Sequence, residues 1–317
     1  MSDSVLVTGA AGFIGSQLSE RLLAEGREVL GIDCLTDYYD PQIKRGNLSV
    51  CLKHPSFQFL EEDLMEADLP SLLDGCKRVF HLSAQAGVRA SWGADFGIYL
   101  RENLAVTQRI LESLKSFPNV RLVYASTSSV YGQVESLPMR EEQRPRPFSP
   151  YGVTKLSAEQ MVDLYRMNFG LQARALRLFT VYGPRQRPDM AFSRFFRAAL
   201  REEEIPVYGD GKQTRDYTFV EDIVECFLRA AEYEGEHFVF NAGGGSRLPL
   251  LEVFEIMESL LGKPLRLRHE ERKKGDVLDT LASTERIREE LDFLPQVSLT
   301  EGLARQLEWT LETGDAV

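Results

Sequence analysis

Apolar positions along the first 180 residues follow two different spacings, and each spacing predicts one kind of element. Short, nearly continuous apolar runs at residues 5–7, 28–33, 57–60, 79–82, 121–125 and 172–179 predict strands buried on both faces, as in a parallel sheet. Between these runs, apolar residues recur at helical spacing. Strand and helix therefore alternate, which predicts an α/β fold with a Rossmann-like, doubly wound parallel sheet.

Three glycines follow the first apolar run, Gly9, Gly12 and Gly15, and an amphipathic helix begins among them. Glycine permits a tight turn and the close approach of a pyrophosphate, and the start of a helix offers unpaired N–H groups to phosphates. The second run ends at Asp33, where a carboxylate can accept both hydroxyls of an adenosine ribose and would repel a 2′-phosphate. We therefore predict a site for NAD rather than NADP; a plain turn with a surface aspartate is the alternative.

Beyond residue 180 the character of the chain changes: it contains Pro184, Pro188 and Pro206, its predicted elements are shorter, and arginine is more frequent. No flexible linker, low-complexity tract or internal repeat separates the two parts, so we expect them to pack tightly with the substrate in the cleft between them. We assign residues 1–180 to an NAD-binding Rossmann domain. Residues 181–317 are expected to form a smaller C-terminal α/β substrate lobe, with some chain crossing back to the first lobe.

The composition narrows the class of protein. The chain has 317 residues, of which 43% are hydrophobic and 27% charged, as in ordinary globular proteins. The net charge of −11 argues against nucleic acids and anionic membranes as partners. Scattered cysteines and histidines indicate neither a metal site nor disulfides. No apolar run approaches membrane-spanning length and the first strand begins close to Met1, so we expect a cytoplasmic protein.

Tyr151 and Lys155 are four residues apart on a predicted helix and therefore share one face. They follow the hydroxyl cluster at residues 126–129, which lies at the end of the fifth strand and points toward the cofactor crevice. A tyrosine acting as a base near neutral pH needs its pKa lowered by about three units, which a lysine ammonium and a nicotinamide ring can supply. We predict that Tyr151 is the base, assisted by Lys155 and the Thr127 or Ser128 hydroxyl; a solvated surface pair is the alternative.

Other positions near the strand ends extend the predicted cofactor site. Asp63 follows the third strand, where it can accept a hydrogen bond from an adenine amino group or face water, and a loop of small residues follows the fourth strand. The predicted cofactor residues are Gly9, Gly12, Phe13, Ile14, Gly15, Asp33, Asp63, Leu64, Ala84, Ala86, Asn103, Tyr151 and Lys155.

The three glycines, Asp33, the segment at residues 127–132 and the Tyr151/Lys155 pair together resemble the extended short-chain dehydrogenase/reductase family, in particular its nucleotide-sugar epimerases. The segments at residues 37–40, 85–89 and 179–191 resemble the UDP-glucuronate 4-epimerases. This resemblance implies an isomerase that keeps NAD bound: Tyr151 takes the proton of the sugar 4-hydroxyl as hydride leaves C4, and the 4-keto sugar turns before the hydride returns. It also implies a homodimer formed through helices near 97–116 and 151–169.

Two arginines bear on the choice of sugar. Arg185 and Arg187 are expected on the substrate side of the cleft, where a guanidinium can hold a carboxylate by paired hydrogen bonds, unless both belong to a solvated loop. The resemblance favours Arg187 as the clamp of the uronate carboxylate, with Arg215 on the diphosphate and Asp276 on the uridine ribose. The substrate residues that it implies are Ser128, Ser129, Thr180, Arg185, Arg187, Arg215 and Asp276.

Sister subgroups differ from this chain at two of these positions. The UDP-xylose-forming UDP-glucuronate decarboxylases carry Glu at the position of Ser129, and the 4,6-dehydratases carry an Asp-Glu pair at those of Ser128 and Ser129. Neither acid is present here, which disfavours both reactions. The alternative functions are those of a UDP-glucuronate decarboxylase and of a UDP-glucose 4-epimerase. A non-catalytic NAD-binding regulator is disfavoured because the Tyr151/Lys155 pair is retained.

Overall fold

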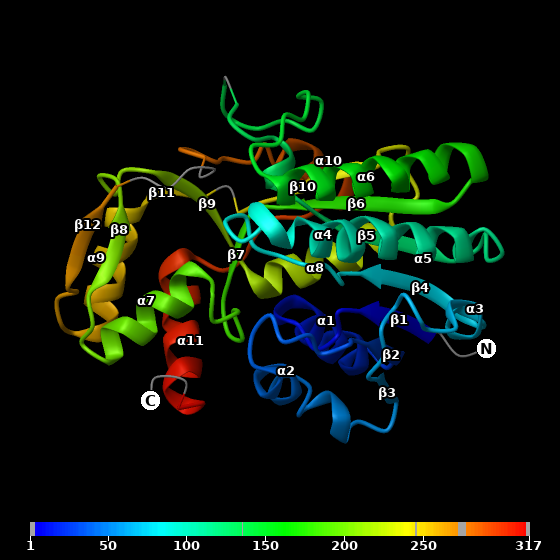
Figure 1. The fold of residues 1–317 in the computed structure, drawn as a ribbon, viewed down its shortest axis with the longest axis horizontal. Helices are drawn as coiled ribbons and strands as arrows, with labels where there is room; N and C mark the ends of the chain where they lie inside the picture. Colours follow the sequence, from blue (N-terminus) through cyan, green and yellow to red (C-terminus); the bar gives the residue numbers. More distant parts are fainter. Residues whose placement is uncertain (1–3, 135, 245, 272–276, 315–317) are drawn as a thin grey trace.

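The computed structural model describes residues 4–134, 136–244, 246–271 and 277–314. A seven-stranded parallel sheet in the order β10-β6-β5-β4-β1-β2-β3 forms the larger lobe in this part of the chain (Figure 1). Its strands are β1 Ser4–Thr8, β2 Glu28–Ile32, β3 Phe57–Leu60, β4 Cys76–His81, β5 Arg121–Thr127, β6 Gln172–Leu178 and β10 Val239–Ala242. The predicted fold class is confirmed, and β10 is a strand that the apolar runs did not indicate.

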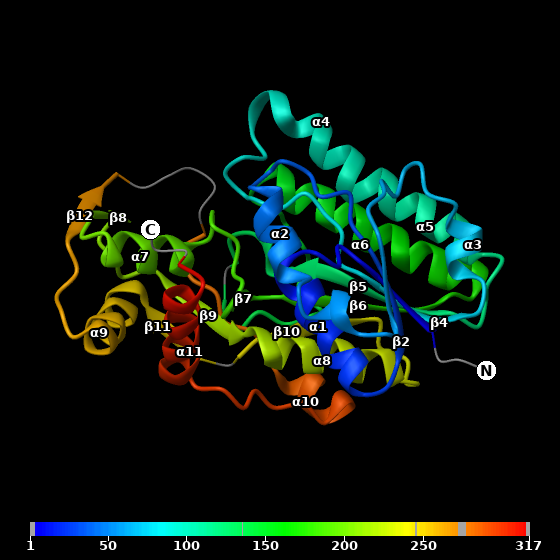
Figure 2. The ribbon, with the colours of Figure 1, turned by 90° about the horizontal axis from the view of Figure 1, so that it is seen from below.

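Helices cover both faces of this sheet (Figure 2). One face carries α3 Leu69–Leu73, α4 Phe96–Tyr99, a π-helical turn at Leu100–Ala105, α5 Val106–Leu114 and α6 Pro150–Phe169, and the other carries α1 Phe13–Ala24 and α8 Val220–Glu232. Side chains of β1 point alternately to the two faces of the sheet. Leu6 packs in the core under α5 and α6, whereas Val5 and Val7 pack in the core under α1 and α8. Burial on both faces explains the continuous apolar run of β1.

The smaller lobe is built on two short sheets, at the left of Figure 1. The strands β7 Thr180–Tyr182, β9 Thr214–Phe219 and β11 Arg247–Pro249 form one, and β8 Ile205–Tyr208 pairs with β12 Leu267–Glu270 in the other. The helices are α7 Ala191–Leu200, α9 Leu250–Leu261 and α11 Leu299–Glu312. The aromatic rings of Tyr182, Phe192, Tyr217 and Phe219 pack together in its interior, mostly edge to face.

The chain passes between the lobes several times. After β9 in the smaller lobe, α8 packs on β5 and β6, and β10 pairs with β6 at the edge of the large sheet. Later, α10 (Glu285–Leu291) packs on β10 and α8. These crossings connect the two lobes through several segments of the main chain.

Two helix starts position the site. The hydroxyl of Ser149 accepts the N–H of Gly152 at 3.1 Å and Pro150 opens α6, which fixes Tyr151 in the first turn of the helix. In contrast, α1 begins after Gly12 without a side-chain cap, so its first N–H groups stay available to a ligand. Within the described ranges, no helix is long and apolar enough to cross a membrane.

Candidate active site

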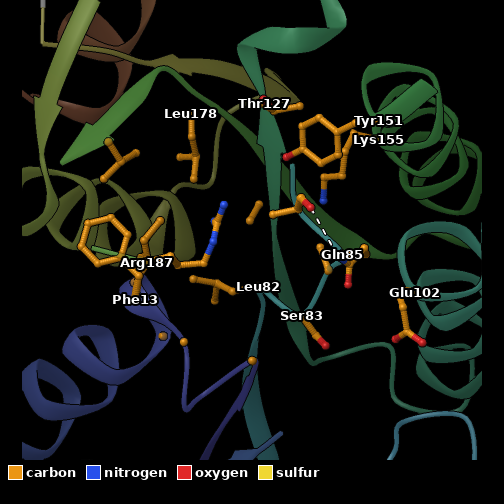
Figure 3. Close-up of a pocket in the computed structure, with 18 of the residues that line it drawn as sticks. Phe13, Leu82, Ser83, Gln85, Glu102, Thr127, Tyr151, Lys155, Leu178 and Arg187 are labelled. Carbon is orange, nitrogen blue, oxygen red and sulfur yellow. Dashed lines mark hydrogen bonds between the residues drawn. The ribbon is translucent and has the colours of Figure 1, made fainter. Parts of the chain in front are cut away.

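A cavity of about 430 Å³ opens at the carboxyl ends of the central strands, between α1, α6 and the start of the smaller lobe (Figure 3). This is the position at which doubly wound sheets bind their ligands. The predicted site residues that line it are Gly9, Gly12, Phe13, Ile14, Gly15, Asp33, Ala84, Ala86, Thr127, Ser128, Ser129, Tyr151, Lys155, Thr180 and Arg187. The cavity thus brings together residues from the first strand to the beginning of the smaller lobe.

The glycine turn between β1 and α1 is closely packed. Gly9 has φ +70°, and a Cβ there would lie 2.9 Å from the Ser83 nitrogen. A Cβ on Gly15 would lie 2.2 Å from the carbonyl oxygen of Gly9. Only glycine fits at these two positions without displacing the backbone, and the turn leaves the first N–H groups of α1 facing the cavity, as a pyrophosphate requires.

Asp33 lies at the end of β2, on the wall of the same cavity. Its carboxylate accepts the N–H of Leu35 at 2.9 Å and the N–H of Ala11 at 3.2 Å. Burial raises the pKa of Asp33, and these backbone hydrogen bonds with the charge of Lys44 act against the increase. The turn, the open helix start and the fixed carboxylate fit the pyrophosphate and adenosine ribose of NAD.

Tyr151 and Lys155 enter the cavity from α6, and Arg187 enters from the opposite side (Figure 3). Burial raises the pKa of Tyr151, while the charge of Arg187 and a hydrogen bond with Thr127 lower it. The ring of Tyr99 packs edge-on against Tyr151, with 6.3 Å between the centroids. The two groups that lower the pKa are therefore already beside the phenol that the sequence predicted as the base.

Lys155 is 3% exposed, and its ammonium lies 4.2 Å from the centroid of the Tyr124 ring. Burial lowers the pKa of Lys155 to about 7, and the charge of Glu159 acts to raise it. His81, in contact with the hydroxyls of Thr8 and Thr107, has its pKa lowered to about 3, first by burial and then by the charge of Lys155. His81 is therefore neutral near pH 7, and Lys155 is the basic group beside Tyr151 that titrates in that range.

A buried ion pair lies below Lys155. Glu159, with no exposed surface, accepts two hydrogen bonds from Arg177, at 2.6 and 3.0 Å, and one from the hydroxyl of Ser126, at 2.5 Å. Arg177 also donates to the hydroxyl of Tyr131, which in turn donates to Asn241 of β10. This network fixes α6 on β5 and β6, and so fixes the position of Tyr151 and Lys155 relative to the strand ends.

Arg187 is paired within the cavity. Its Nε and one terminal nitrogen contact the two carboxylate oxygens of Asp189, at 2.9 and 3.0 Å. The hydroxyl of Tyr38, from the loop after β2, donates to the same carboxylate at 3.3 Å. Burial acts to lower the pKa of Arg187, but the hydrogen bonds and charge of Asp189 raise it above its ordinary value. Arg187 is thus a permanent cation inside the cavity.

A second cavity of about 240 Å³ continues from the first into the smaller lobe. Ser128, Ser129 and Thr180 line both cavities, and Arg215 lines only the second. The guanidinium of Arg215 donates to the carbonyls of residues 214, 277 and 278. Arg215 therefore lies on the route along which a nucleoside diphosphate would leave the first cavity, while Asp276 lies outside the described residues.

Two predicted cofactor residues near the third strand do not line the cavity. Asp63 pairs with Arg101 at 2.6 Å and caps the turn at Met65, with an N–H to carboxylate distance of 2.9 Å. Leu64 is 5% exposed and packs in the core under α5 and α6. Local sequence cannot separate these roles, because a carboxylate that follows a strand serves a ligand, a turn or a neighbouring arginine equally well.

Asn103 and Arg185 also lie outside the cavity. Asn103 is 1% exposed and exchanges hydrogen bonds with the backbone of Gln85, at 2.8 and 3.1 Å, so that it supports a loop of the cavity from behind. Arg185, with φ +64°, turns toward α1 and pairs with Glu20 at 2.7 Å. Of the two neighbouring arginines, Arg187 alone faces the cavity among the described residues.

Several cavity residues were not singled out from the sequence as site residues. They include Cys34, Thr36, Tyr38, Tyr39, Lys44, Gln85, Glu102 and Met190. Lys44 is 6% exposed and donates to Thr36 at 2.8 and 3.0 Å, which holds the loop after β2 against the cavity. No local signal identifies it, because a lysine on a short helix is usually solvated. Among the described residues, no three His, Cys, Asp or Glu side chains are grouped as metal ligands.

The chain belongs to the NAD dependent epimerase/dehydratase family, which it matches over residues 5–243. It is 40% identical over 310 residues to an uncharacterized UDP-glucose epimerase of Bacillus subtilis, covering 96% of each chain. It is 37% identical over 311 residues to a UDP-glucuronate 4-epimerase of Thermodesulfobacterium geofontis, covering 97% of this chain and 96% of the relative.

A solved structure extends the comparison. The UDP-glucuronic acid 4-epimerase of Bacillus cereus, crystallised with UDP-glucuronic acid and NAD, superimposes with a TM-score of 0.95 at 39% identity and covers 98% of this chain and 99% of that one. The family, the NAD cofactor and the isomerase class predicted from the sequence are thereby confirmed, and together they support a nucleotide-sugar 4-epimerase.

Proposed function

We propose that this protein interconverts UDP-glucuronate and UDP-galacturonate by inverting C4 of the sugar. One observation carries the proposal: Arg187 and Tyr151 line the same cavity from opposite sides, so a sugar between them would present its carboxylate to one and its 4-hydroxyl to the other. A guanidinium is well suited to a carboxylate, because it offers two parallel N–H donors.

The chain's own residues would carry the proton and orient the sugar. Tyr151, as the phenolate, accepts the proton of the 4-hydroxyl, Lys155 stabilises that phenolate by its charge, and Thr127 positions the alcohol by a shared hydrogen bond. Bound NAD supplies the acceptor that takes the hydride from C4 and returns it. The glycine turn and Asp33 would hold the cofactor.

The substrate would extend across both cavities. Ser128, Ser129 and Thr180, at the junction, would contact the sugar, and Arg215 would contact the diphosphate in the second cavity. We extend the same proposal to Asp276 as a contact to the uridine ribose. In this proposal the larger lobe would bind the cofactor and the smaller lobe would bind the nucleotide of the substrate.

The carboxylate contact also bears on the outcome of the reaction. A 4-keto uronate is a β-keto acid, and it loses CO₂ when its C5–carboxylate bond aligns with the carbonyl π system. Arg187 would hold the carboxylate out of that alignment, and Ser129 occupies the position where the decarboxylases carry Glu. Both features favour epimerisation over decarboxylation.

A UDP-glucose 4-epimerase is the second candidate, favoured by the name of the Bacillus subtilis relative. The two functions differ in their need for Arg187. Calorimetric titration of the NAD-loaded protein should show that Arg187→Ala weakens UDP-glucuronate binding at least tenfold, the value of one hydrogen bond to a charged group, and UDP-glucose binding far less. The matched control is Arg185→Ala, in the same loop but outside the cavity. Equal losses for the two sugars would favour the neutral substrate.

We also propose a homodimer formed through α6 and the helical segment at residues 96–114. Large apolar side chains on these helices are exposed, at 41 to 72%: Ile98, Leu100, Val153, Leu164, Met167 and Phe169. An exposed apolar surface of this kind, spread over two adjacent helices, marks a protein interface. Two copies would then pack these helices together, away from both cavities.

A further inference from the structure

The Arg187–Asp189 pair uses only one edge of the guanidinium. Nε and NH2 of Arg187 point at the two oxygens of Asp189, at 2.9 and 3.0 Å. A guanidinium has five N–H donors, so this side-on contact leaves both donors of NH1 and one of NH2 on the outer edge. Among the described residues, no partner of NH1 is found, and the guanidinium reaches toward the middle of the cavity in Figure 3.

The loop that carries this pair is rigid. Met190 donates to the carbonyl of Arg187 at 3.0 Å, which closes a turn with Pro188 at its second position, where proline is preferred. Gln186, 3% exposed, accepts at 3.0 Å from the N–H of Ser193 and at 3.0 Å from the side chain of Gln306. The backbone on both sides of Arg187 is therefore fixed from the interior of the smaller lobe.

Asp189 also accepts a hydrogen bond from a residue of the larger lobe. The hydroxyl of Tyr38 donates to the Asp189 oxygen that NH2 of Arg187 also contacts. Tyr38 belongs to the loop that follows Asp33, the proposed ribose contact. The carboxylate thus has partners on two sides, and its charge is compensated without any contribution from a substrate.

We propose that Asp189 is the residue that makes this site selective for a uronate, by holding Arg187 side-on so that its outer edge meets the sugar carboxylate. This inference rests on the proposed function. An arginine side chain loses rotamer entropy when it is fixed, and fixing it in advance spares the substrate that cost. The two carboxylates would occupy different edges of one planar cation and need not compete.

The opposite interpretation is that Asp189 competes with the substrate for Arg187. The two interpretations predict opposite signs for Asp189→Asn, which keeps the shape and removes the charge. If Asp189 orients Arg187, the variant should bind UDP-glucuronate roughly tenfold more weakly, the value of one hydrogen bond to a charged group, and bind UDP-glucose and UDP within about twofold of the wild type. If Asp189 competes, UDP-glucuronate should bind more tightly.

The test is calorimetric titration of the NAD-loaded protein with UDP-glucuronate, UDP-glucose and UDP. Asp163→Asn is the matched control, because it removes the acid of another short-range Arg–Asp pair, at 2.8 Å on α6. In an Arg187→Ala background, Asp189→Asn should have no further effect on UDP-glucuronate, because the residue acts through Arg187.

Three results would overturn the inference: tighter or unchanged UDP-glucuronate binding in Asp189→Asn, an equal loss for all three ligands, or a loss that persists in the Arg187→Ala background. An equal loss would mean that Asp189 only supports the turn. Failure of the proposed function is seen separately, in the wild-type protein, which would then bind UDP-glucuronate no better than UDP-glucose.

Discussion

Lys155 and Glu159 are separated by one turn of α6, and both side chains are buried, 3% and 0% exposed. The carboxylate of Glu159 acts to raise the pKa of Lys155 against the effect of burial. Its own charge is balanced by Arg177, whose Nε and NH2 donate to it. Lys155 is therefore kept partly charged near neutral pH by an acid that does not line the cavity.

This relationship predicts a shift in the pH profile of Glu159→Gln. In the proposed mechanism Tyr151 is deprotonated and Lys155 protonated. Burial raises the pKa of Tyr151 and lowers that of Lys155 to about 7, so the limb of the profile near neutral pH reports Lys155. Without the Glu159 charge the pKa of Lys155 falls further, so this limb should move to lower pH. Ser126→Ala is the control, since it removes a hydrogen bond to Glu159 but keeps the charge. An unmoved limb in Glu159→Gln would contradict the coupling.

The same substitution should reduce stability. Glu159→Gln leaves the guanidinium of Arg177, 4% exposed, without its counter-charge, and breaking a buried ion pair costs about 3–5 kcal/mol. Urea denaturation of the NAD-free protein measures the free energy of unfolding. Replacing both partners together, as in Glu159→Gln with Arg177→Met, should cost less than the sum of the two single changes; additive losses would mean that the pair is not coupled.

Tyr151→Phe separates catalysis from binding. The phenyl ring keeps the edge-on contact with Tyr99 but has no proton acceptor, so kcat should fall by roughly 10²–10⁴-fold or more, the usual share of a general base. NAD should stay bound, which absorbance and fluorescence of the purified variant can measure. Normal turnover in this variant would remove Tyr151 from its role as the base.

Gly15→Ala tests the cofactor turn. The added Cβ would lie 2.2 Å from the carbonyl oxygen of Gly9, so the turn must open and its N–H groups must move away from the pyrophosphate. We expect the variant to be purified without NAD and to show low activity that rises with added NAD. Gly46→Ala, with nothing within 4 Å of the new Cβ, is the control. Full NAD retention in Gly15→Ala would contradict the assignment.

The proposed dimer is tested on the exposed apolar surface of α6. Leu164 and Met167, 55% and 72% exposed, are far enough from the cavity to be changed without touching it. Replacing both with Glu should convert a dimer to a monomer in light scattering, because burying two carboxylates in an apolar interface is costly. A monomeric wild-type protein, or a dimer unaffected by both changes, would contradict this interface.

The parts of the fold that local patterns determine were predictable. The run at β1, buried on both faces, and the glycine turn after it follow from Val5 to Gly15 alone. Strand β10 could not be predicted, because Val239–Ala242 is short and its place beside β6 depends on a pairing with residues more than 60 positions earlier. Long-range pairing leaves little trace in a single sequence.

The same limit applies to the site. The Tyr151/Lys155 pair was predictable because four-residue spacing on a helix fixes a shared face. The different directions of the Arg185 and Arg187 side chains could not be predicted. They depend on the backbone at Arg185, which has φ +64°, and on the partners of the two side chains, Glu20 and Asp189. Asp189 itself has no local signal beyond an acid two residues after an arginine.

The central claim is best tested by the identity of the product. The purified protein should be incubated with UDP-glucuronate, without added reductant, while proton NMR follows the anomeric signals. The account predicts a UDP-galacturonate signal that grows to a constant ratio with the substrate, with no release of CO₂. A UDP-pentose signal with CO₂ release would make the protein a decarboxylase, and conversion of UDP-glucose but not of UDP-glucuronate would contradict the role of Arg187.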